Sequence, residues 1–190
     1  MSTRNLYALL NPTTLAVIGA SSRHGSVGAT VWRNLRAGSF KGMVYAVNPK
    51  HRRLDGQIVF ASVPKLPQAP DLAVICSPPH TVPGIVAELG ARGTHAALVL
   101  TAGLDAVQRQ AMLDAAKPHL LRVLGPGSIG VLAPHIGLNA SLAVRDAQPG
   151  ELAFISQSGA LASAMLDWAR ERGIGFSHVV SLGQHADVDA

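Results

Sequence analysis

Residues 15–32, LAVIGASSRHGSVGATVW, contain the features that decide the fold. An apolar run typical of a buried strand ends at Gly19, and helix-spaced apolar residues follow between Ser26 and Ala37. A strand that passes through a short glycine- and serine-containing turn into a helix opens a βαβ unit. Serine can cap such a helix, and glycine lets backbone N–H groups approach an anion at its positive end. The stretch therefore predicts either a capped structural turn or an anion-binding loop.

The same alternation of short apolar runs and helix-period stretches continues along the chain. The expected strands are Leu15–Gly19, Met43–Val47, Leu72–Cys76, Ala96–Thr101 and Leu121–Leu124, and the expected helices are Ser26–Ala37, Pro83–Ala91 and Asp105–Lys117. Runs that are apolar almost throughout are typical of parallel strands covered on both faces. Gly38 is expected to end its helix as a left-handed cap, and proline-rich residues 61–71 are expected to form a surface connection. This pattern predicts an α/β fold with a doubly wound parallel sheet.

A second unit begins near residue 146. Residues 134–150 are expected to cross between domains, and a strand Leu152–Ser156, a helix Ala160–Arg172 and a strand Phe176–Leu182 follow. We therefore expect one domain over residues 1–145 and the opening βαβ of another over 146–190. Forty residues of βαβ cannot close a core alone, so we expect the chain to be the N-terminal part of a longer protein. Asp187 and Asp189 are expected to be solvated.

Composition excludes several classes of protein. Hydrophobic residues make up 48% of the 190 residues, charged residues 14%, and the mean hydropathy is +0.26, the opposite of a disordered chain. No apolar run approaches the roughly 18 residues of a membrane span. Cys76 is the single cysteine, so no internal disulfide can form. These features favour a cytoplasmic protein with no membrane partner.

The net charge of +5 is unevenly distributed. Residues 1–54 hold eight basic side chains and no acidic one, while the remainder is net acidic. Such a basic half indicates an anionic partner. Only eight aromatic residues accompany it, and the longest basic run is Lys50–Arg53, so a phosphorylated small molecule is favoured over nucleic acid.

The glycine spacing narrows the choice of ligand. Gly19, Gly25 and Gly28 form a longer loop than the dinucleotide fingerprint G-x-G-x-x-G. An NAD site also needs an acidic residue about 20 positions on, but Lys50 stands there without a nearby carboxylate. A lysine suits a ribose phosphate, either the 2′-phosphate of NADP or the 3′-phosphate of coenzyme A (CoA). These residues alone do not decide between NADP and CoA.

Signals for other chemistry are weak. The histidines lack metal-ligand spacing, and Ser158 is not in a G-x-S-x-G elbow. Cys76 is expected to be an inert core thiol. We therefore expect no metal site and no catalytic residue in this chain. A second strand-to-helix loop, Ser156–Gly159, predicts either a structural cap or another anion site.

Taken in order, the motifs GASSRHGSVG, YAVNPK, DLAVICSPP, LTAG, LGPGSIG, GLNAS, FISQSGALASAMLDWA and SLGQHADVD resemble the NDP-forming acyl-CoA synthetases, relatives of the succinyl-CoA synthetase α subunit. The resemblance covers essentially the whole chain and is closest to the bacterial branch that includes Pat-type protein lysine acetyltransferases. Gly127 and Gln184 stand where this family usually has asparagine. The resemblance implies a Rossmann-like CoA-binding domain followed by a flavodoxin-like ligase domain.

The resemblance also implies roles for particular residues. The residues it places around CoA or acyl-CoA are Gly19, Ser21, Ser22, Arg23, Gly25, Ser26, Val27, Gly28, Val47, Asn48, Pro49, Lys50, Ser77, Pro78, Thr101 and Ala102. Ser156, Gln157, Ser158 and Gly159 would face the phosphoryl centre. The phosphorylated histidine of the family lies beyond Ala190, so none of the histidines here takes that role.

The activity implied is that of an acid–thiol ligase, or an acyl-CoA sensor beside an acetyltransferase domain. The chain alone is expected to be inactive, because ATP or ADP and Mg²⁺ would bind only through an ATP-grasp part in the same or a partner chain. The resemblance is compatible with a homo-oligomer. The alternative from the residues is an NADP-binding Rossmann redox or sensor domain, and a weaker one is a nucleic-acid-binding module.

Overall fold

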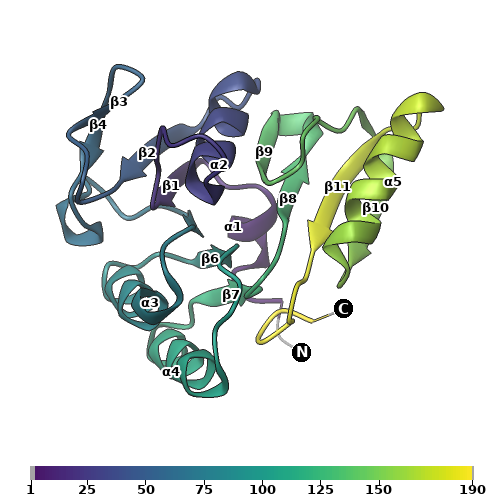
Figure 1. Cartoon of the computed structure of the whole chain (residues 1–190). Helices are drawn as coiled ribbons and strands as arrows, with labels where there is room; N and C mark the ends of the chain where they lie inside the picture. The colour runs from purple at the N-terminus through teal and green to yellow at the C-terminus, as the bar shows by residue number, and fades with distance from the viewer. Residues whose placement is uncertain (1–2, 190) are drawn as a thin grey trace.

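The structure, a computed structural model, describes residues 3–189 and contains two sheets. The larger sheet has seven strands in the order β3-β4-β2-β1-β5-β6-β7 (Figure 1). Its strands are β1 (Thr14–Ile18), β2 (Met43–Val47), β3 (Arg53–Leu54), β4 (Gln57–Phe60), β5 (Leu72–Ile75), β6 (Ala96–Val99) and β7 (Arg122–Leu124). All pairs are parallel except β3–β4. The predicted doubly wound α/β sheet is confirmed.

Helices cover both faces of this sheet. They are α1 (Leu6–Leu10), α2 (Val27–Ala37), α3 (Val82–Ala91) and α4 (Ala106–Ala116), with 3₁₀ turns at Val63–Lys65, Pro79–Thr81, Lys117–His119 and Pro134–Ile136. Along β1, Leu15 and Val17 face the core formed with α1 and α2, while Ala16 and Ile18 face the core formed with α3 and α4. This alternation explains why the strand is apolar throughout.

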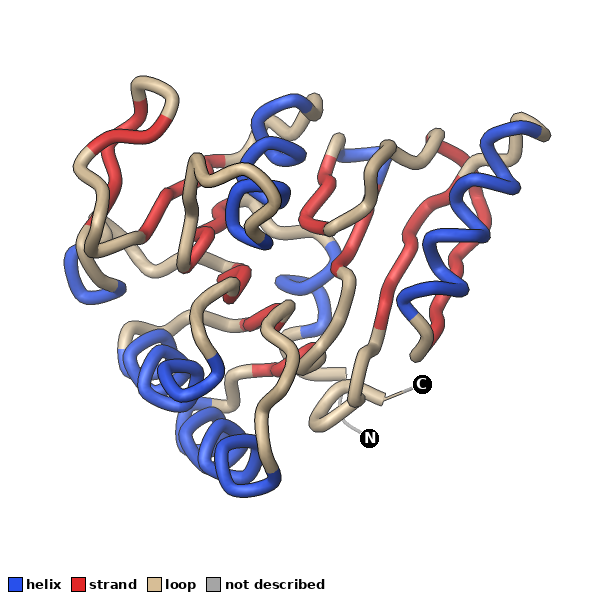
Figure 2. Tube along the Cα trace, in the orientation of Figure 1, coloured by secondary structure: helices blue, strands red, loops and turns tan. Residues whose placement is uncertain are grey.

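The smaller sheet has the order β10-β11-β8-β9. Its strands are β8 (Gly130–Ala133), β9 (Leu138–Ser141), β10 (Pro149–Ser156) and β11 (Phe176–Ser181), and α5 (Gly159–Glu171) connects the last two. Figure 2 shows α5 along the outer side of this sheet. Val131 and Val180 join the core shared with α2, while Leu132 and Val179 join the core beneath α5. The predicted βαβ is present, but β8 pairs antiparallel with its strand β11.

Three local expectations need correction. Residues 134–150 are more than a crossing, because they contain β9 and the first residues of β10. Gly38 is extended, at φ −73° and ψ 174°, rather than left-handed. A glycine is needed there because a Cβ would lie 2.9 Å from the carbonyl oxygen of Gly137. Asp187 is not simply solvated: its Oδ2 accepts a 2.8 Å hydrogen bond from the backbone N–H of Val123.

The hairpin β3–β4 was not expected from the apolar pattern. It turns at Asp55 and Gly56, whose φ values are +46° and +78°. Trp32 on α2 donates its indole N–H to Asp55 Oδ2 at 2.8 Å, which fixes the hairpin tip to the helix. The hairpin extends the large sheet beyond β2, and Arg52 and Arg53 lie on the side of β4 that faces away from β2.

Within residues 3–189, no helix combines the length and apolar character that crossing a bilayer requires.

The start of β1 is fixed by one carboxylate, which gives a stability prediction. Asp71 Oδ2 accepts hydrogen bonds from Thr13 N (2.9 Å), Thr13 Oγ1 (2.6 Å) and Thr14 N (3.0 Å). Burial raises the pKa of Asp71, but these hydrogen bonds outweigh it and hold the pKa below its ordinary value. A carboxyl whose folded-state pKa is depressed stabilises the protein above its unfolded pKa and loses that contribution as the pH falls through the folded pKa. Asp71→Ala is expected to cost about 1 kcal/mol at pH 7.

Urea unfolding at several pH values checks this prediction. The loss should be largest at neutral pH and should shrink toward pH 3, because wild type then also loses the ionised acceptor. Asp114→Ala is the control, since Asp114 accepts only an exposed hydrogen bond from Gln110 among the contacts described for it. An Asp71→Ala penalty that stays constant from pH 7 to pH 3 would contradict the assignment.

Candidate functional site

Four predicted segments meet at the edge of the large sheet where its parallel strands end. Gly19 follows β1, Asn48 follows β2, Ser77 lies just beyond β5, and Thr101 lies just beyond β6. β1 lies between β2 and β5, and β6 is beside β5, so these ends are neighbours. In open α/β sheets this edge is where ligands bind. The structure thus brings together the segments that sequence reasoning assigned to one site.

The β1–α2 loop forms a capped turn with exposed polar groups. Ser26 caps α2 by accepting a hydrogen bond from Ala29 N at 3.3 Å, and its hydroxyl donates to Arg23 O at 2.8 Å. Arg23 N in turn donates to Ser21 Oγ at 3.0 Å. Ser22, Arg23 and Gly25 are exposed, and the first turn of α2 contains no acidic residue. The positive end of the helix dipole therefore remains available to an anion.

Two glycines let the strand and the helix approach closely. A Cβ on Gly28 would lie 1.9 Å from the carbonyl oxygen of Gly19, so only glycine fits at that position of α2. Gly19 itself has φ +93°, and a Cβ there would lie 3.0 Å from the carbonyl group of Cys76. By contrast, no atom lies within 4 Å of a Cβ built on Gly25. Gly19 and Gly28 thus serve packing, and the space above Gly25 is open.

The end of β2 is tied to this loop by Asn48. Its Nδ2 donates to Ala20 O at 2.8 Å, and its Oδ1 accepts from Lys50 N at 2.9 Å. Gly19 N also donates to Val47 O at 2.8 Å. Pro49 and Lys50 are exposed beyond this contact. One side chain therefore fixes the segment carrying Lys50 relative to the β1–α2 loop.

The ends of β5 and β6 are joined in a similar way. Thr101 Oγ1 donates to Ser77 O at 2.7 Å, and Thr101 itself is buried, whereas Pro78 and Ala102 are exposed. Burial raises the pKa of the Cys76 thiol to about 12, so this thiol stays protonated at neutral pH. The buried groups here hold the loops in place and the exposed ones can contact a ligand.

The second predicted anion loop belongs to the small sheet. Ser158 caps α5 by accepting from Leu161 N at 3.2 Å, and Ser156 Oγ accepts from Ser158 N at 3.1 Å. A Cβ on Gly159 would lie 2.4 Å from Ile129 Cγ2. Gln157 is exposed. The cap predicted as the structural alternative is present, and an anion role for Ser156–Gly159 remains a prediction.

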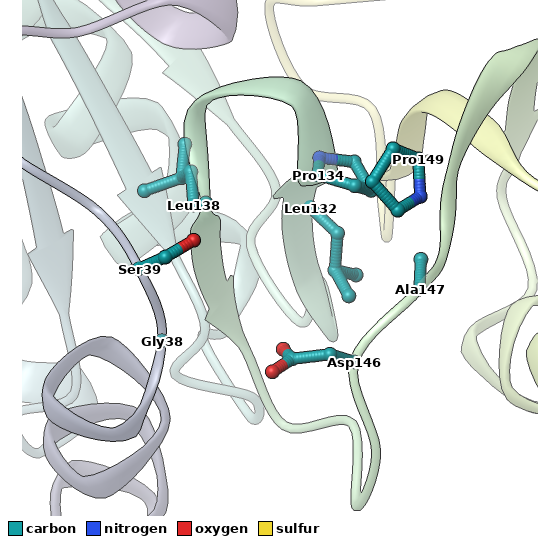
Figure 3. Close-up of a pocket in the computed structure, with 9 residues that line it drawn as sticks. Gly38, Ser39, Leu132, Pro134, Leu138, Asp146, Ala147 and Pro149 are labelled. Atoms are coloured by element: carbon teal, nitrogen blue, oxygen red, sulfur yellow. The ribbon is translucent and has the colours of Figure 1, made fainter.

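Two hollows lie away from this edge. One, of about 150 Å³, lies between the end of α2 and the β8–β9 hairpin, where Ser39 and Asp146 line it from different segments (Figure 3). The other, of about 550 Å³, lies beside α4 and β7. The predicted CoA residues line neither hollow. Among residues 3–189, no three His, Cys, Asp or Glu side chains are grouped to hold a metal ion.

Sequence reasoning missed Arg52 as a candidate site residue. It lies exposed at the start of the β3–β4 hairpin, two residues after Lys50, and its carbonyl accepts from Val59 N at 3.1 Å. The Asp55-Gly56 dipeptide, a frequent two-residue hairpin turn, was the signal that could have found this hairpin. A basic side chain at that place can add to the charge that Lys50 presents.

A parallel sheet whose strand ends carry a glycine-spaced helix start and a basic second-strand end is typical of nucleotide-binding α/β domains. The particular family follows from comparison with family models: residues 13–134 match the CoA binding domain, and residues 149–190 match the succinyl-CoA ligase like flavodoxin domain. The chain belongs to the CoA-binding domain family. The domain boundary expected at residue 145 stays a prediction, because β9 lies between the two matched regions.

Similar proteins agree with this assignment. The chain is 40% identical to acetate–CoA ligase (ADP-forming) I of Archaeoglobus fulgidus over 95% of its own length and 27% of that protein. It is 36% identical to the α subunit of acetate–CoA ligase (ADP-forming) I of Pyrococcus furiosus, over 97% of the chain and 42% of the subunit. The chain thus spans between about a quarter and two fifths of these relatives.

A solved structure of the dinucleotide forming acetyl-coenzyme A synthetase 1 of Ca. Korarchaeum cryptofilum, in complex with phosphate and ADP, superimposes with a TM-score of 0.92. It shares 37% identity and covers 97% of this chain and 40% of that one. The resemblance read from the sequence is confirmed: the chain corresponds to the CoA-binding N-terminal part of ADP-forming acyl-CoA synthetase-like proteins. These findings do not favour the NADP alternative and give no support to an acetyltransferase.

Proposed function

We propose that this chain binds CoA at the strand-end edge of the large sheet and serves as the CoA-binding part of an ADP-forming acyl-CoA ligase in the cytoplasm. The observation that supports it most strongly is the convergence of the β1–α2 loop with the Asn48 segment, joined by the Asn48–Ala20 hydrogen bond. Similarity to ADP-forming acetate–CoA ligases supports the reaction class.

In this proposal each segment at the strand-end edge contacts a different part of CoA. The β1–α2 loop, with Ser22, Arg23 and Gly25 exposed, holds the diphosphate at the start of α2. Lys50 and Arg52 face the 3′-phosphate, and Ser77, Pro78 and Ala102 guide the pantetheine arm. The open space at Gly25 and the acid-free helix start fit such a polyanion.

CoA, when bound, supplies the thiol that forms the new C–S bond of an acyl-CoA as phosphate leaves an acyl phosphate. The chain contributes by positioning, because holding a reactant in place removes much of the entropic barrier of a two-molecule reaction. The Ser156–Gly159 loop would face the phosphoryl centre at the capped start of α5. ATP or ADP and Mg²⁺ would enter through an ATP-grasp part in the same or a partner chain.

Calorimetric titration with CoA, dephospho-CoA, NADP and NAD tests the proposal. CoA should bind most tightly, and dephospho-CoA should bind about fivefold more weakly because an exposed lysine–phosphate contact contributes about 1 kcal/mol. Lys50→Ala should remove the difference between CoA and dephospho-CoA. Lys65→Ala is the matched control, since Lys65 is exposed on a 3₁₀ turn outside the proposed site. Tighter binding of NADP than of CoA, or no CoA binding, would overturn the proposal.

A further inference from the structure

Two histidine rings are in contact within the small sheet. His178 lies on β11, and His135 lies on the 3₁₀ turn that joins β8 to β9. Their ring centroids are 4.9 Å apart, with the ring planes inclined by 67°. His135 Nδ1 also donates a hydrogen bond to Ser177 O at 3.1 Å, which fixes the His135 ring beside β11. The turn and the strand therefore meet through this pair of imidazoles.

The His178 side chain also contacts the large-sheet unit. Val180, two residues further along β11, belongs to the core that contains Ala8 and Leu9 of α1, and alternate residues of a strand share one face. The His178 ring forms a hydrogen bond with the backbone of Leu10, the last residue of α1. The helix α5 lies over the opposite face, which carries Val179. His178 thus lies where β11 packs against α1.

One nitrogen of the His178 ring has no partner. Its Nε2 atom is buried and forms no hydrogen bond. A neutral imidazole carries a hydrogen on only one nitrogen, whereas a protonated imidazole carries one on each. Protonation would therefore turn Nε2 into a buried donor without an acceptor, which is costly, and would place a positive charge beside the His135 ring.

The elements around His178 do not offset such a charge. Among the described residues, β8 and β9 contain no ionisable side chain, β10 contains only the exposed Glu151, and α1 contains only Tyr7, which is 72% exposed. Burial, together with the neighbouring His135, lowers the pKa of His178 below its ordinary value of 6.5, while the hydrogen bond to Leu10 acts in the opposite direction. The folded protein therefore favours neutral His178.

We propose that the His135–His178 contact is a pH-sensitive switch, which holds β11 against α1 while His178 is neutral and releases it when His178 takes up a proton in mildly acidic solution. The contribution of His178 to stability is complete above the pKa of the unfolded chain and is lost as the pH falls through the lower pKa of the folded state. The switch does not rest on CoA binding, because Leu10 precedes β1 whereas the CoA-binding loops follow the strands.

Amide hydrogen exchange of the whole chain at about pH 7.5 and about pH 5.5 tests the proposal. After correction for the intrinsic pH dependence of exchange, protection of the Val179 and Val180 amides should fall about fivefold or more at the lower pH. Protection of the Val74 amide, on β5 of the large sheet, should change less than about twofold. Asp71 does not contribute to this difference, because its pKa lies below its ordinary value of 3.8.

Three variants assign the effect to the histidine pair. His178→Phe keeps a ring of similar size that cannot take up a proton, so protection of β11 should no longer depend on pH in this range. His135→Gln should raise the pKa of His178, measured by NMR titration of the ring protons, and should reduce the fall in protection. The control His80→Gln removes an exposed histidine from the 3₁₀ turn before α3 and should change neither result.

Two results would overturn the proposal. One is a fall in β11 protection that is as large in His178→Phe as in wild type. The other is a wild-type His178 ring that titrates at or above the ordinary value of 6.5. The second measurement needs no substitution, so it decides the question even if His178→Phe does not fold.

Discussion

Gly28→Ala is expected to weaken CoA binding about a hundredfold and to cost about 2–3 kcal/mol of stability. The added Cβ would lie 1.9 Å from Gly19 O, so α2 must move away from β1. Overpacking of this kind typically costs about 1–3 kcal/mol, which exceeds the helix propensity gained by alanine. Moving the helix start also misplaces the loop N–H groups, and losing one or two charge-assisted hydrogen bonds corresponds to about the stated loss of affinity. Urea unfolding and CoA calorimetry measure both effects.

Gly84→Ala is the matched control for this substitution. Gly84 is also a helical glycine, on α3, but it is exposed and no atom lies within 4 Å of a Cβ built on it. The control should leave CoA binding unchanged and raise stability by up to about 1 kcal/mol. If Gly28→Ala bound CoA like wild type, the close approach of α2 and β1 would have no part in the site.

Asn48→Ala is expected to weaken CoA binding about tenfold. It removes the hydrogen bonds to Ala20 O and from Lys50 N, which join the two proposed phosphate-binding segments. Freeing one residue that binding must then order costs about 1–2 kcal/mol, which is close to a tenfold loss. Calorimetry with CoA and dephospho-CoA should show similar losses for both, because Asn48 positions the whole segment rather than the 3′-phosphate contact alone.

Asn34→Ala separates this effect from a general loss of stability. Asn34 is buried at the far end of α2 and donates to Ser141 O and Ala143 O, each at 2.9 Å. Its removal leaves two buried carbonyls without this donor and should cost about 1–2 kcal/mol of stability, with CoA affinity kept within about twofold. A tenfold loss of CoA affinity in Asn34→Ala would mean that stability, not the Asn48 contact, governs binding.

The central sheet was predictable because its signals are local. The five parallel strands of its centre and one edge read as continuous apolar runs, and the helices α2, α3 and α4 fall within one or two residues of their expected ranges. The site segments were predictable for the same reason: residues that follow parallel strands must share one edge. Lys50 was noticed because an acidic residue was expected at its place.

The features of the structure that could not be predicted from the sequence depend on contacts between residues far apart in the chain. The pairing of β8 with β11 joins segments about fifty residues apart, and nothing in residues 130–141 alone indicates it. The close approach of Gly38 to Gly137 is likewise a tertiary contact, and so is the hydrogen bond from Val123 to Asp187. Asn48 could be assigned to the site, but its part in joining two loops requires knowing where Ala20 O lies.

The hairpin β8–β9 has a consequence for how proteins of this kind can be divided. It follows the large sheet directly in the chain, yet it supplies two of the four strands of the small sheet and packs its other face on α2. A break in the gene between the two matched regions, which are separated by residues 135–148, would therefore divide the strands of the small sheet between two chains. The two matched regions of this chain therefore share one small sheet and are not two separately closed units.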